Sequence, residues 1–249
     1  EGVMERLRIG FFKFTSCSGC QMSVARLLAS SPLLERFEIV YWPMLETAKW
    51  SGHLDAAFVE GCVSTNRELE ELRGIREDSR LLIALGECAV DGGVQSIALS
   101  TPRREVVERV YEHSSWISAR NVGRVGDYVE VDVEVHGCPP GPETLWEVFI
   151  SLSLGRRPRL REHPLCVECK LRDLPCLLIE AHQPCMGPVT NAGCGALCPS
   201  LNRACEGCYG PNPDANWTSQ REVLRRIGLS DGDVDRRFRK YAVARLSKK

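Results

Sequence analysis

The stretch DAAFVEGCVSTNRELEELRGIREDSRLLIALGEC, residues 55–88, contains two apolar runs separated by an amphipathic segment, and a cysteine follows each run. The runs at 55–61 and 80–87 are short, continuous and largely aliphatic, as is typical of strands buried on both faces. Between them, Thr65 and Glu68 have the spacing of a capping box, and leucine and isoleucine recur at helical spacing. The stretch therefore predicts a strand, a helix and a strand, the repeating unit of a parallel α/β sheet.

The same alternation extends to both sides of this unit. The other predicted elements are strands at 7–14, 37–44 and 128–137 and helices near 20–30 and 142–154. Strands that alternate with helices in this way make residues 1–155 a single parallel sheet domain.

Five cysteines come directly after predicted strands: Cys17, Cys20, Cys62, Cys88 and Cys138. The carboxyl ends of parallel strands share one edge of a sheet, and ligands bind in the crevice outside that edge. Four thiolates can therefore converge there from distant parts of the chain. Five candidates for four places leave one cysteine over, and the spacing does not say which one.

Beyond Gly155 the regular periodicity gives way to proline, glycine and cysteine. Eight of the thirteen cysteines lie between Cys166 and Cys208. Residues 156–211 hold few large apolar side chains, so we expect bound metal to stabilise this segment. Residues 212–249 form a third region that is predicted to be helical from Trp217, with ten basic against four acidic residues from there to the end. A solvated helix face explains this charge, and so does docking on an acidic partner.

Composition narrows the classes of function. The 32 basic residues nearly balance the 33 acidic ones, so no nucleic-acid-binding surface is expected. No apolar run approaches the roughly 20 residues that cross a bilayer, and the opening residues do not resemble a signal peptide. We therefore expect a cytoplasmic protein without a membrane span. In a reducing compartment, closely spaced cysteines are more often metal ligands than disulfides, and an odd total also argues against complete pairing.

Two kinds of metal centre fit the paired motifs CVEC, which begins at Cys166, and CEGC, which begins at Cys205. Zinc ribbons need four ligands and about 15–20 residues between the pairs, whereas 35 residues intervene here, from Lys170 to Ala204, and four more cysteines fall among them. Iron–sulfur cubanes take four thiolates each and accept irregular spacing. Eight cysteines suffice for two cubanes, and the sheet edge supplies a third, which leaves one cysteine over.

Several nucleotide and nucleophile signatures are missing from the sequence: GxGxxG after the first strand, GxxxxGK[ST] and GxSxG. Three redox centres without a nucleotide site indicate a protein that conducts electrons between other chains.

Five ordered motifs carry a family resemblance: FTSCSGCQMSVARLL, VEGCVST, ALGECAVDGGV, HGCPPGPETLWE and PCMGPVTNAGC. In this order they resemble the small, electron-transferring subunit of nickel-iron hydrogenases, and most closely the soluble group that includes the sulfhydrogenase delta subunits. The resemblance implies a flavodoxin-like domain that holds a proximal 4Fe-4S cluster, followed by a segment that carries medial and distal clusters.

The resemblance also implies three ligand sets. For the proximal cluster it implies Cys17, Cys20, Cys88 and Cys138; for the distal cluster Cys166, Cys169, Cys176 and Cys185; and for the medial cluster Cys194, Cys198, Cys205 and Cys208. Periplasmic relatives have histidine at the position of Cys166, and proline at the position of Cys198, which leaves them a three-iron medial cluster. Cysteine at both positions implies three complete 4Fe-4S clusters here.

Other residues near the implied clusters have less certain roles. The family pattern makes Cys62 the leftover thiol. His163 precedes Cys166 with HxxC spacing and is an alternative ligand, although a loop role is more common. His136 either donates to a cluster sulfur or is a surface histidine, and Glu60 and Glu87 at strand ends are candidates for a proton path.

The resemblance implies a division of labour in which this chain carries no catalytic residue of its own and is inactive alone. A partner large subunit holds nickel and iron and splits hydrogen. The three clusters relay electrons to an acceptor subunit of the flavin diaphorase, F420-reducing or heterodisulfide-reductase type. The alternatives are an iron–sulfur subunit of a complex I-related oxidoreductase, whose relatives lack the eight-cysteine segment, and a zinc-binding structural protein.

Overall fold

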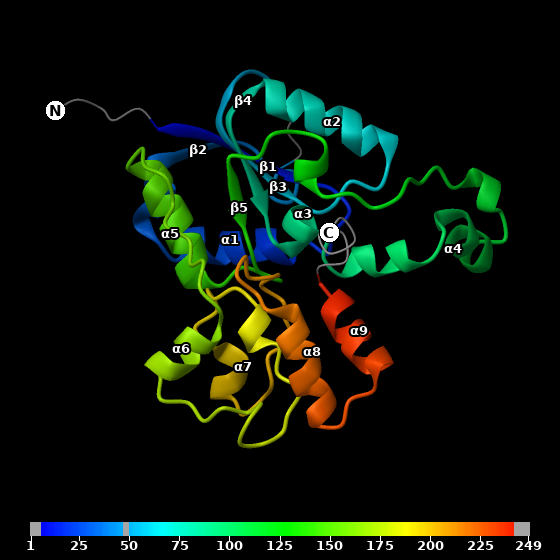
Figure 1. The fold of residues 1–249 in the computed structure, drawn as a ribbon. Helices are drawn as coiled ribbons and strands as arrows, with labels where there is room; N and C mark the ends of the chain where they lie inside the picture. The colour runs from blue at the N-terminus through cyan, green and yellow to red at the C-terminus, as the bar shows by residue number, and fades with distance from the viewer. Residues whose placement is uncertain (1–5, 47–49, 242–249) are drawn as a thin grey trace.

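Five parallel strands form one sheet in the computed structural model, which describes residues 6–46 and 50–241 (Figure 1). The strands are β1 (Leu7–Lys13), β2 (Phe37–Tyr41), β3 (Leu54–Glu60), β4 (Ser79–Leu85) and β5 (Val133–Val135). Their order in the sheet is β2-β1-β3-β4-β5, with parallel pairing throughout. This is the flavodoxin-like order, in which the chain reverses its direction of winding between β1 and β3. The predicted α/β fold class is confirmed.

Helices cover both faces of the sheet because successive strand side chains point to opposite sides. Phe11 packs in the apolar cluster beneath α1 (Gly19–Ala29) and α5 (Pro142–Ser153), whereas its neighbour Phe12 packs in the cluster beneath α2 (Asn66–Glu77). The predicted capping box at the start of α2 is present in both directions.

The other helices lie outside these two layers. They are α3 (Glu87–Asp91), α4 (Arg103–Val110), α6 (Cys166–Leu171), α7 (Leu197–Ser200), α8 (Trp217–Arg226) and α9 (Asp231–Arg239), with short 3₁₀ helices at Pro32–Arg36, Val94–Ser100, Ser114–Trp116, Val125–Asp127 and Gly187–Val189. Figure 1 shows α6 to α9 gathered below the sheet, next to α3. Among the residues that the structure describes, no helix is long and apolar enough to cross a membrane.

The last strand is much shorter than the predicted range 128–137. The Asp132 carboxylate accepts the N–H of Leu82 at 2.8 Å and pairs with Arg76 at 2.6 Å, so a side chain takes the Leu82 N–H, while only the Leu82 carbonyl accepts from backbone, the Asp132 N–H at 2.9 Å. Ladder pairing with β4 begins only at Val133. Val129 and Val131, which precede the strand, pack against the apolar cluster beneath α2 although their backbone is irregular. This packing explains why they alternate with polar residues as in a strand.

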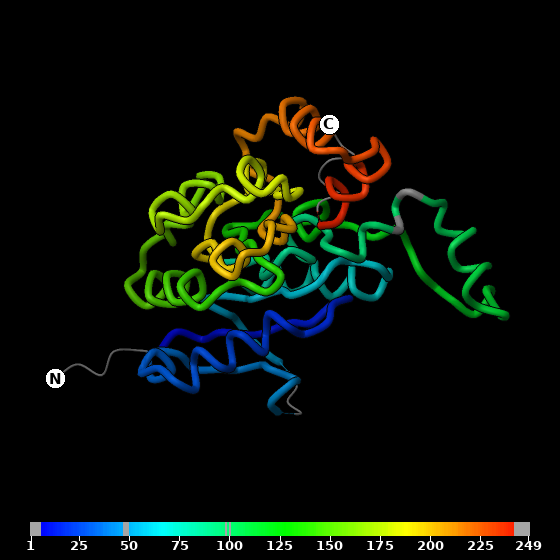
Figure 2. Tube along the Cα trace, turned by 90° about the horizontal axis from the view of Figure 1, so that it is seen from below, coloured from blue at the N-terminus to red at the C-terminus, as the bar shows by residue number. Residues whose placement is uncertain are grey.

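The helix α4 had no counterpart in the sequence expectations. It lies on an arm, residues 101–122, that extends away from the sheet (Figure 2). Within α4 only Val107 is buried. A helix with so little apolar surface lacks the periodic pattern by which such elements are recognised.

The C-terminal helices pack onto the cysteine-rich segment. One apolar cluster joins Leu165 and Met186 of that segment to Leu224 in α8 and Val234 in α9. Residues 217–241 are mainly helical, as predicted, with a break between α8 and α9, and the final part of the predicted tail lies outside the described residues.

The aromatic core beneath α5 gives a stability prediction. Phe149 is fully buried and stacks on Phe58 with ring centroids 5.0 Å apart. We expect Phe149→Ala to destabilise the protein by about 3–5 kcal/mol, because it leaves a cavity in this core. The matched control is Trp146→Ala on the exposed side of the same helix, which should change stability little. Thermal unfolding of both variants checks this, and equal midpoints would contradict the packing described here.

Candidate metal centres

Four cysteines converge at the carboxyl edge of the sheet; we call them the proximal group: Cys17, Cys20, Cys88 and Cys138. Burial raises the pKa of Cys20, and the charges of the other three thiols raise it further, so all four lie within electrostatic reach of one another. Gly86 leaves room for this convergence, because a Cβ at that position would lie 2.2 Å from Cys20 Sγ.

Glu60 organises the start of α1 beneath the proximal group. It is buried at the end of β3, and its carboxylate accepts the N–H of Cys20 at 3.3 Å and of Gln21 at 3.1 Å. Burial raises the pKa of Glu60, and these two hydrogen bonds partly offset the rise. The carboxylate therefore holds the CSGC turn in place.

Cys62 lies beside the proximal group and shares a hydrogen-bond network with one member of it, because Gln95 accepts from Cys88 Sγ at 3.0 Å and donates to the same Thr15 carbonyl as Cys62. The residue is fully buried, and its Sγ donates to the Thr15 carbonyl at 3.4 Å. Burial raises the pKa of Cys62 to about 12, with the charge of Glu68 as the next cause. The pKa of Cys88 is also raised to about 12, first by burial and then by the charge of Cys62. The two thiols are therefore neighbours.

A second set of thiols lies around α6; we call it the distal group: Cys166, Cys169, Cys176 and Cys185. The pKa of Cys166 rises to about 11, first through burial and then through the charges of the other three members. A Cβ at Gly187 would lie 3.4 Å from Cys166 Sγ and 3.5 Å from Cys185 Sγ, so glycine lets these two thiols approach the same point.

The third set, the medial group, lies between the other two: Cys194, Cys198, Cys205 and Cys208. Burial raises the pKa of Cys208 to about 12, and the charges of Cys194, Cys138 and Cys198 contribute in that order. One of these charges belongs to the proximal group, so the medial group adjoins it.

The medial and distal groups also adjoin. The N–H of Cys205 donates to Cys185 Sγ at 3.3 Å, and after burial the charge of Cys185 is the largest cause of the raised pKa of Cys205. The twelve cysteines therefore form a continuous series from the sheet edge through the medial group to the distal group.

Backbone N–H groups point toward several of these sulfurs. Gly19 donates to Cys17 Sγ at 3.4 Å. In the cysteine-rich segment, Gly207 donates to Cys205 Sγ at 3.4 Å. Such donors stabilise thiolate charge and tune iron–sulfur clusters. Thiols gathered close together beside N–H donors, most of them at least partly buried, fit iron–sulfur clusters, because coordination by metal supplies the positive charge that holds cysteine as thiolate.

A chain of ion pairs ties the cysteine-rich segment to the sheet domain. Buried Glu168 in α6 accepts the N–H of Gly193 and of Ala196, each at 3.0 Å, next to Cys194. Arg161 pairs with Glu168 and also with Glu143 of α5, the latter at 3.2 Å. The Glu168 carboxylate in α6, a helix of the distal group, therefore holds the loop around Cys194, which belongs to the medial group.

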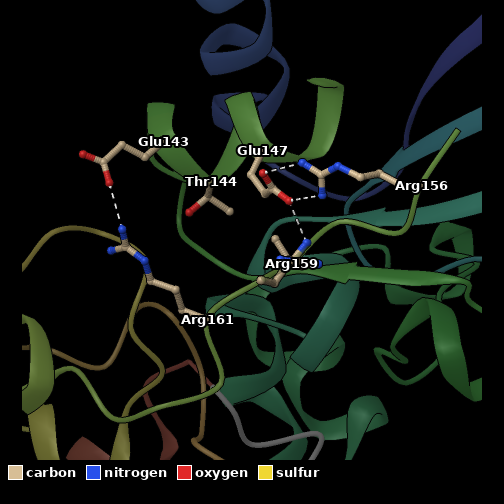
Figure 3. Close-up of a pocket in the computed structure, with 7 residues that line it drawn as sticks. Glu143, Thr144, Glu147, Arg156, Arg159 and Arg161 are labelled. Atoms are coloured by element: carbon tan, nitrogen blue, oxygen red, sulfur yellow. Dashed lines mark hydrogen bonds and ion pairs between the residues drawn. The ribbon is translucent and has the colours of Figure 1, made fainter. Parts of the chain in front are cut away.

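Figure 3 shows the open pocket of about 530 Å³ beside this chain of ion pairs. Its lining includes Glu147 and Arg156, which pair at 2.8 Å, as well as Glu143 and Arg161. The two glutamates of the lining are both ion-paired with arginines of the lining, and no cysteine lines the pocket. The ion pairs in its wall link α5 to the segment that follows it, and the lining offers no thiol for a metal.

The two histidines singled out from the sequence have different surroundings. His163 Nδ1 lies 3.3 Å from the Pro164 carbonyl, and its role as a ligand stays an alternative. His136 Nδ1 lies 3.2 Å from a Glu87 oxygen and 3.7 Å from an Asp91 oxygen.

Sequence reasoning missed Glu168, Asp91 and Tyr209. The Tyr209 hydroxyl accepts the N–H of Gly141 and thereby joins the medial segment to the loop that follows Cys138. Asp91 had a detectable signal, because its four-residue spacing from Glu87 puts both carboxylates on one face of a helix. Glu168 and Tyr209 carry no comparable pattern.

Comparisons with known proteins agree with this architecture. Residues 17–152 match the family described as NADH ubiquinone oxidoreductase, 20 Kd subunit. The delta subunit of sulfhydrogenase 2 from Pyrococcus furiosus is 39% identical, over 95% of this chain and 99% of the relative. A subunit of the vhu F420-non-reducing hydrogenase from Methanocaldococcus jannaschii is 30% identical, over 82% of each chain.

Solved structures show the same fold. A chain of an NAD+-reducing [NiFe]-hydrogenase in the H2-reduced state superposes with a TM-score of 0.55 at 30% identity, over 63% of this chain and 96% of the other. A chain of the Ni-Fe-Se hydrogenase from Desulfomicrobium baculatum has a TM-score of 0.53 at 17% identity, over 88% and 99%, and shares the fold. The chain therefore belongs to the NADH ubiquinone oxidoreductase 20 Kd subunit family and, within it, to the small subunits of hydrogenases.

Proposed function

We propose that this hydrogenase subunit holds three 4Fe-4S clusters, one in each of the proximal, medial and distal groups, and serves as the electron-transfer chain of a nickel-iron enzyme. The observation that carries the proposal is that twelve cysteines lie in one continuous series, which the family pattern divides into three sets of four. Clusters bound there would supply one-electron transfer.

The protein's own contribution is to bind the proposed clusters and to surround them with protein. Burial raises the pKa of Cys20, Cys88 and Cys208, and Cys20 is buried while the other two are partly buried. Gly86 has no side chain to block the Cys20 sulfur, and Gly187 lets the sulfurs of Cys166 and Cys185 approach each other. Glu60 and Glu168 hold the two loops that present Cys20 and Cys194. The assignment of Cys185 and Cys205, which touch, to different clusters follows the family pattern.

The proposed partners follow from the family resemblance. A large subunit with nickel and iron would face the proximal group, and an acceptor subunit of diaphorase, F420-reducing or heterodisulfide-reductase type would receive electrons from the distal side. The proposal also includes a cytoplasmic location and a division into residues 1–155, 156–211 and 212–249.

Two alternatives are less well supported. A complex I-type subunit would account for the match over residues 17–152, but the Pyrococcus furiosus relative aligns over 95% of the chain, well beyond that range. A structural zinc protein would also account for sets of four thiols, but the relatives are described as hydrogenase subunits, and one of them as an iron-sulfur subunit.

The metal content of the anaerobically purified complex tests the proposal. Three cubanes predict about twelve iron atoms and as many sulfides contributed by this chain. Iron and sulfide are measured in the complex to give the number of each per complex. The chain expressed alone and reconstituted is the control for metal held by the partner subunits. A result of four or eight irons would mean that the chain holds one or two clusters. Zinc bound by four thiolates, without broad visible absorption, would overturn the proposal.

A further inference from the structure

The side chain of Gln95 bridges the Cys88 thiol and the loop that follows β1. Cys88 Sγ donates to Gln95 Oε1 at 3.0 Å, and Gln95 Nε2 donates to the Thr15 carbonyl at 3.4 Å. The Cys62 thiol donates to the same carbonyl, also at 3.4 Å. One amide group therefore connects a proposed ligand of the proximal cluster to the leftover thiol beside it.

A well-fixed turn presents Gln95 to this sulfur. The chain turns at Gly93, with φ +54°, before it enters the short 3₁₀ helix that contains Gln95. A Cβ on Gly93 would lie 2.8 Å from Cys88 Sγ, so the backbone passes directly beside the thiol. Fully buried Ser96 donates to the Gly93 carbonyl twice, through its N–H at 3.2 Å and its hydroxyl at 2.7 Å. These contacts hold the turn, and the turn sets the position of Gln95.

Binding of iron changes what Cys88 can do in this hydrogen bond. Cysteine binds metal as a thiolate, which has no proton to donate. Two acceptors, Cys88 Sγ and Gln95 Oε1, would then face each other across 3.0 Å. A half-turn of the terminal amide removes this conflict, because glutamine carries two N–H donors as well as its carbonyl oxygen. After the half-turn an N–H group faces the sulfur.

The other end of the Gln95 amide then needs a donor. The half-turn directs Gln95 Oε1 toward the Thr15 carbonyl, which is also an acceptor. Cys62 is outside the proposed ligand set and keeps its S–H proton, which already points to that carbonyl. Rotation about the Cβ–Sγ bond of Cys62 can redirect the S–H to Gln95 Oε1, so both ends of the amide are satisfied.

We propose that Gln95 donates its amide N–H to Cys88 Sγ when Cys88 binds the proximal cluster, and that this hydrogen bond raises the reduction potential of that cluster. The inference rests on the proposed function, because it requires a cluster at the proximal group. Reduction adds negative charge to a cluster, so a donor to one of its sulfurs stabilises the reduced form more than the oxidised form. The leftover thiol of Cys62 supports the donor orientation of the amide.

The midpoint potential of the proximal cluster in the assembled complex tests the inference. Gln95→Leu keeps a side chain of similar size and removes both ends of the amide. We expect the ratio of reduced to oxidised cluster at a fixed potential to fall by up to about tenfold, which is a downward shift of up to about 59 mV for a one-electron couple. Redox titration followed by electron paramagnetic resonance gives the midpoint, and iron analysis should give the wild-type content.

Val94→Ala is the matched control. Val94 precedes Gln95 in the same turn, is 47% exposed and has no hydrogen-bonding group in its side chain. We expect this variant to keep the wild-type midpoint and the wild-type iron content.

Isotope labelling reports the hydrogen bond itself. The complex is prepared with ¹⁵N in its glutamine side chains, and pulsed electron paramagnetic resonance is recorded on the reduced proximal cluster. We expect a hyperfine coupling to one amide nitrogen in the wild type and in Val94→Ala, and its loss in Gln95→Leu. Absence of the coupling in the wild type would contradict the proposed donor.

Gln95→Glu keeps the test decisive if Gln95→Leu does not assemble. Glutamate preserves the shape of the side chain and its acceptor oxygen but replaces the amide nitrogen by a second oxygen, so we expect a downward shift here too. Equal midpoints in the wild type and the substituted complex, with equal iron, would overturn the role of Gln95 and leave the proposed clusters in place. A wild-type complex that lacks the four irons of the proximal cluster would instead contradict the proposed function.

Discussion

Cys88→Ser is expected to abolish hydrogen-dependent electron transfer by the assembled complex, whereas Cys62→Ser leaves it nearly unchanged. Both residues follow strands at the same sheet edge, and their thiols are neighbours. The difference arises from their surroundings. Cys62 is fully buried and donates to a backbone carbonyl, so serine can replace it with similar volume and the same hydrogen bond.

Cys88 lies instead among the proximal thiols. Its pKa is raised first by burial and then by the charges of Cys62, Cys138 and Cys17, two of which belong to the proposed ligand set. Replacing a soft thiolate by a hydroxyl removes the ligand that iron prefers. The Cys88→Ser complex should therefore lose about four irons and its dye reduction with hydrogen. The reverse result, with the cluster lost only in Cys62→Ser, would show that Cys62 is the proximal ligand.

The second large effect is expected from Cys198→Pro, which should convert the medial cluster to a three-iron form. With three thiolates left, one iron loses its only protein ligand and becomes labile. The backbone should tolerate the change, because Cys198 lies in the first turn of α7, where proline is accommodated. Electron paramagnetic resonance of the oxidised complex should show a new three-iron signal.

A control separates loss of a ligand from disturbance of the helix. Leu197→Ala alters the adjacent residue of α7, which is 57% exposed, and should leave the spectrum unchanged. If Cys198→Pro also keeps the wild-type spectrum, Cys198 is not a ligand. If it loses about four irons rather than one, the medial group needs all four thiolates to retain a cluster.

Local patterns were sufficient for much of the fold. Continuous apolar runs predicted β1, β3 and β4 to within two residues at each end, and the Thr65–Glu68 spacing predicted the start of α2. These signals work because hydrogen bonding and burial repeat along a strand or helix, and the repeat is visible in the residues themselves. The family was likewise readable from five motifs, and the comparisons confirm it.

Elements without a periodic apolar face were not predictable in this way. The helix α4 buries only Val107, and β5 is shortened because the Asp132 side chain takes a partner on β4 that a strand backbone would otherwise take. Both outcomes depend on contacts with distant residues.

The sequence by itself determined the alternating α/β sheet, the placement of cysteines after its strands and the identity of the cysteine-rich segment. The tertiary structure decided which groups meet: Cys185 against Cys205, Glu168 against the Cys194 loop, and Gly210 against Glu87. The reason is physical. A periodic pattern reports which face of an element is buried, whereas a meeting of side chains from separate elements depends on strand order and on how the cysteine-rich segment packs against the sheet edge.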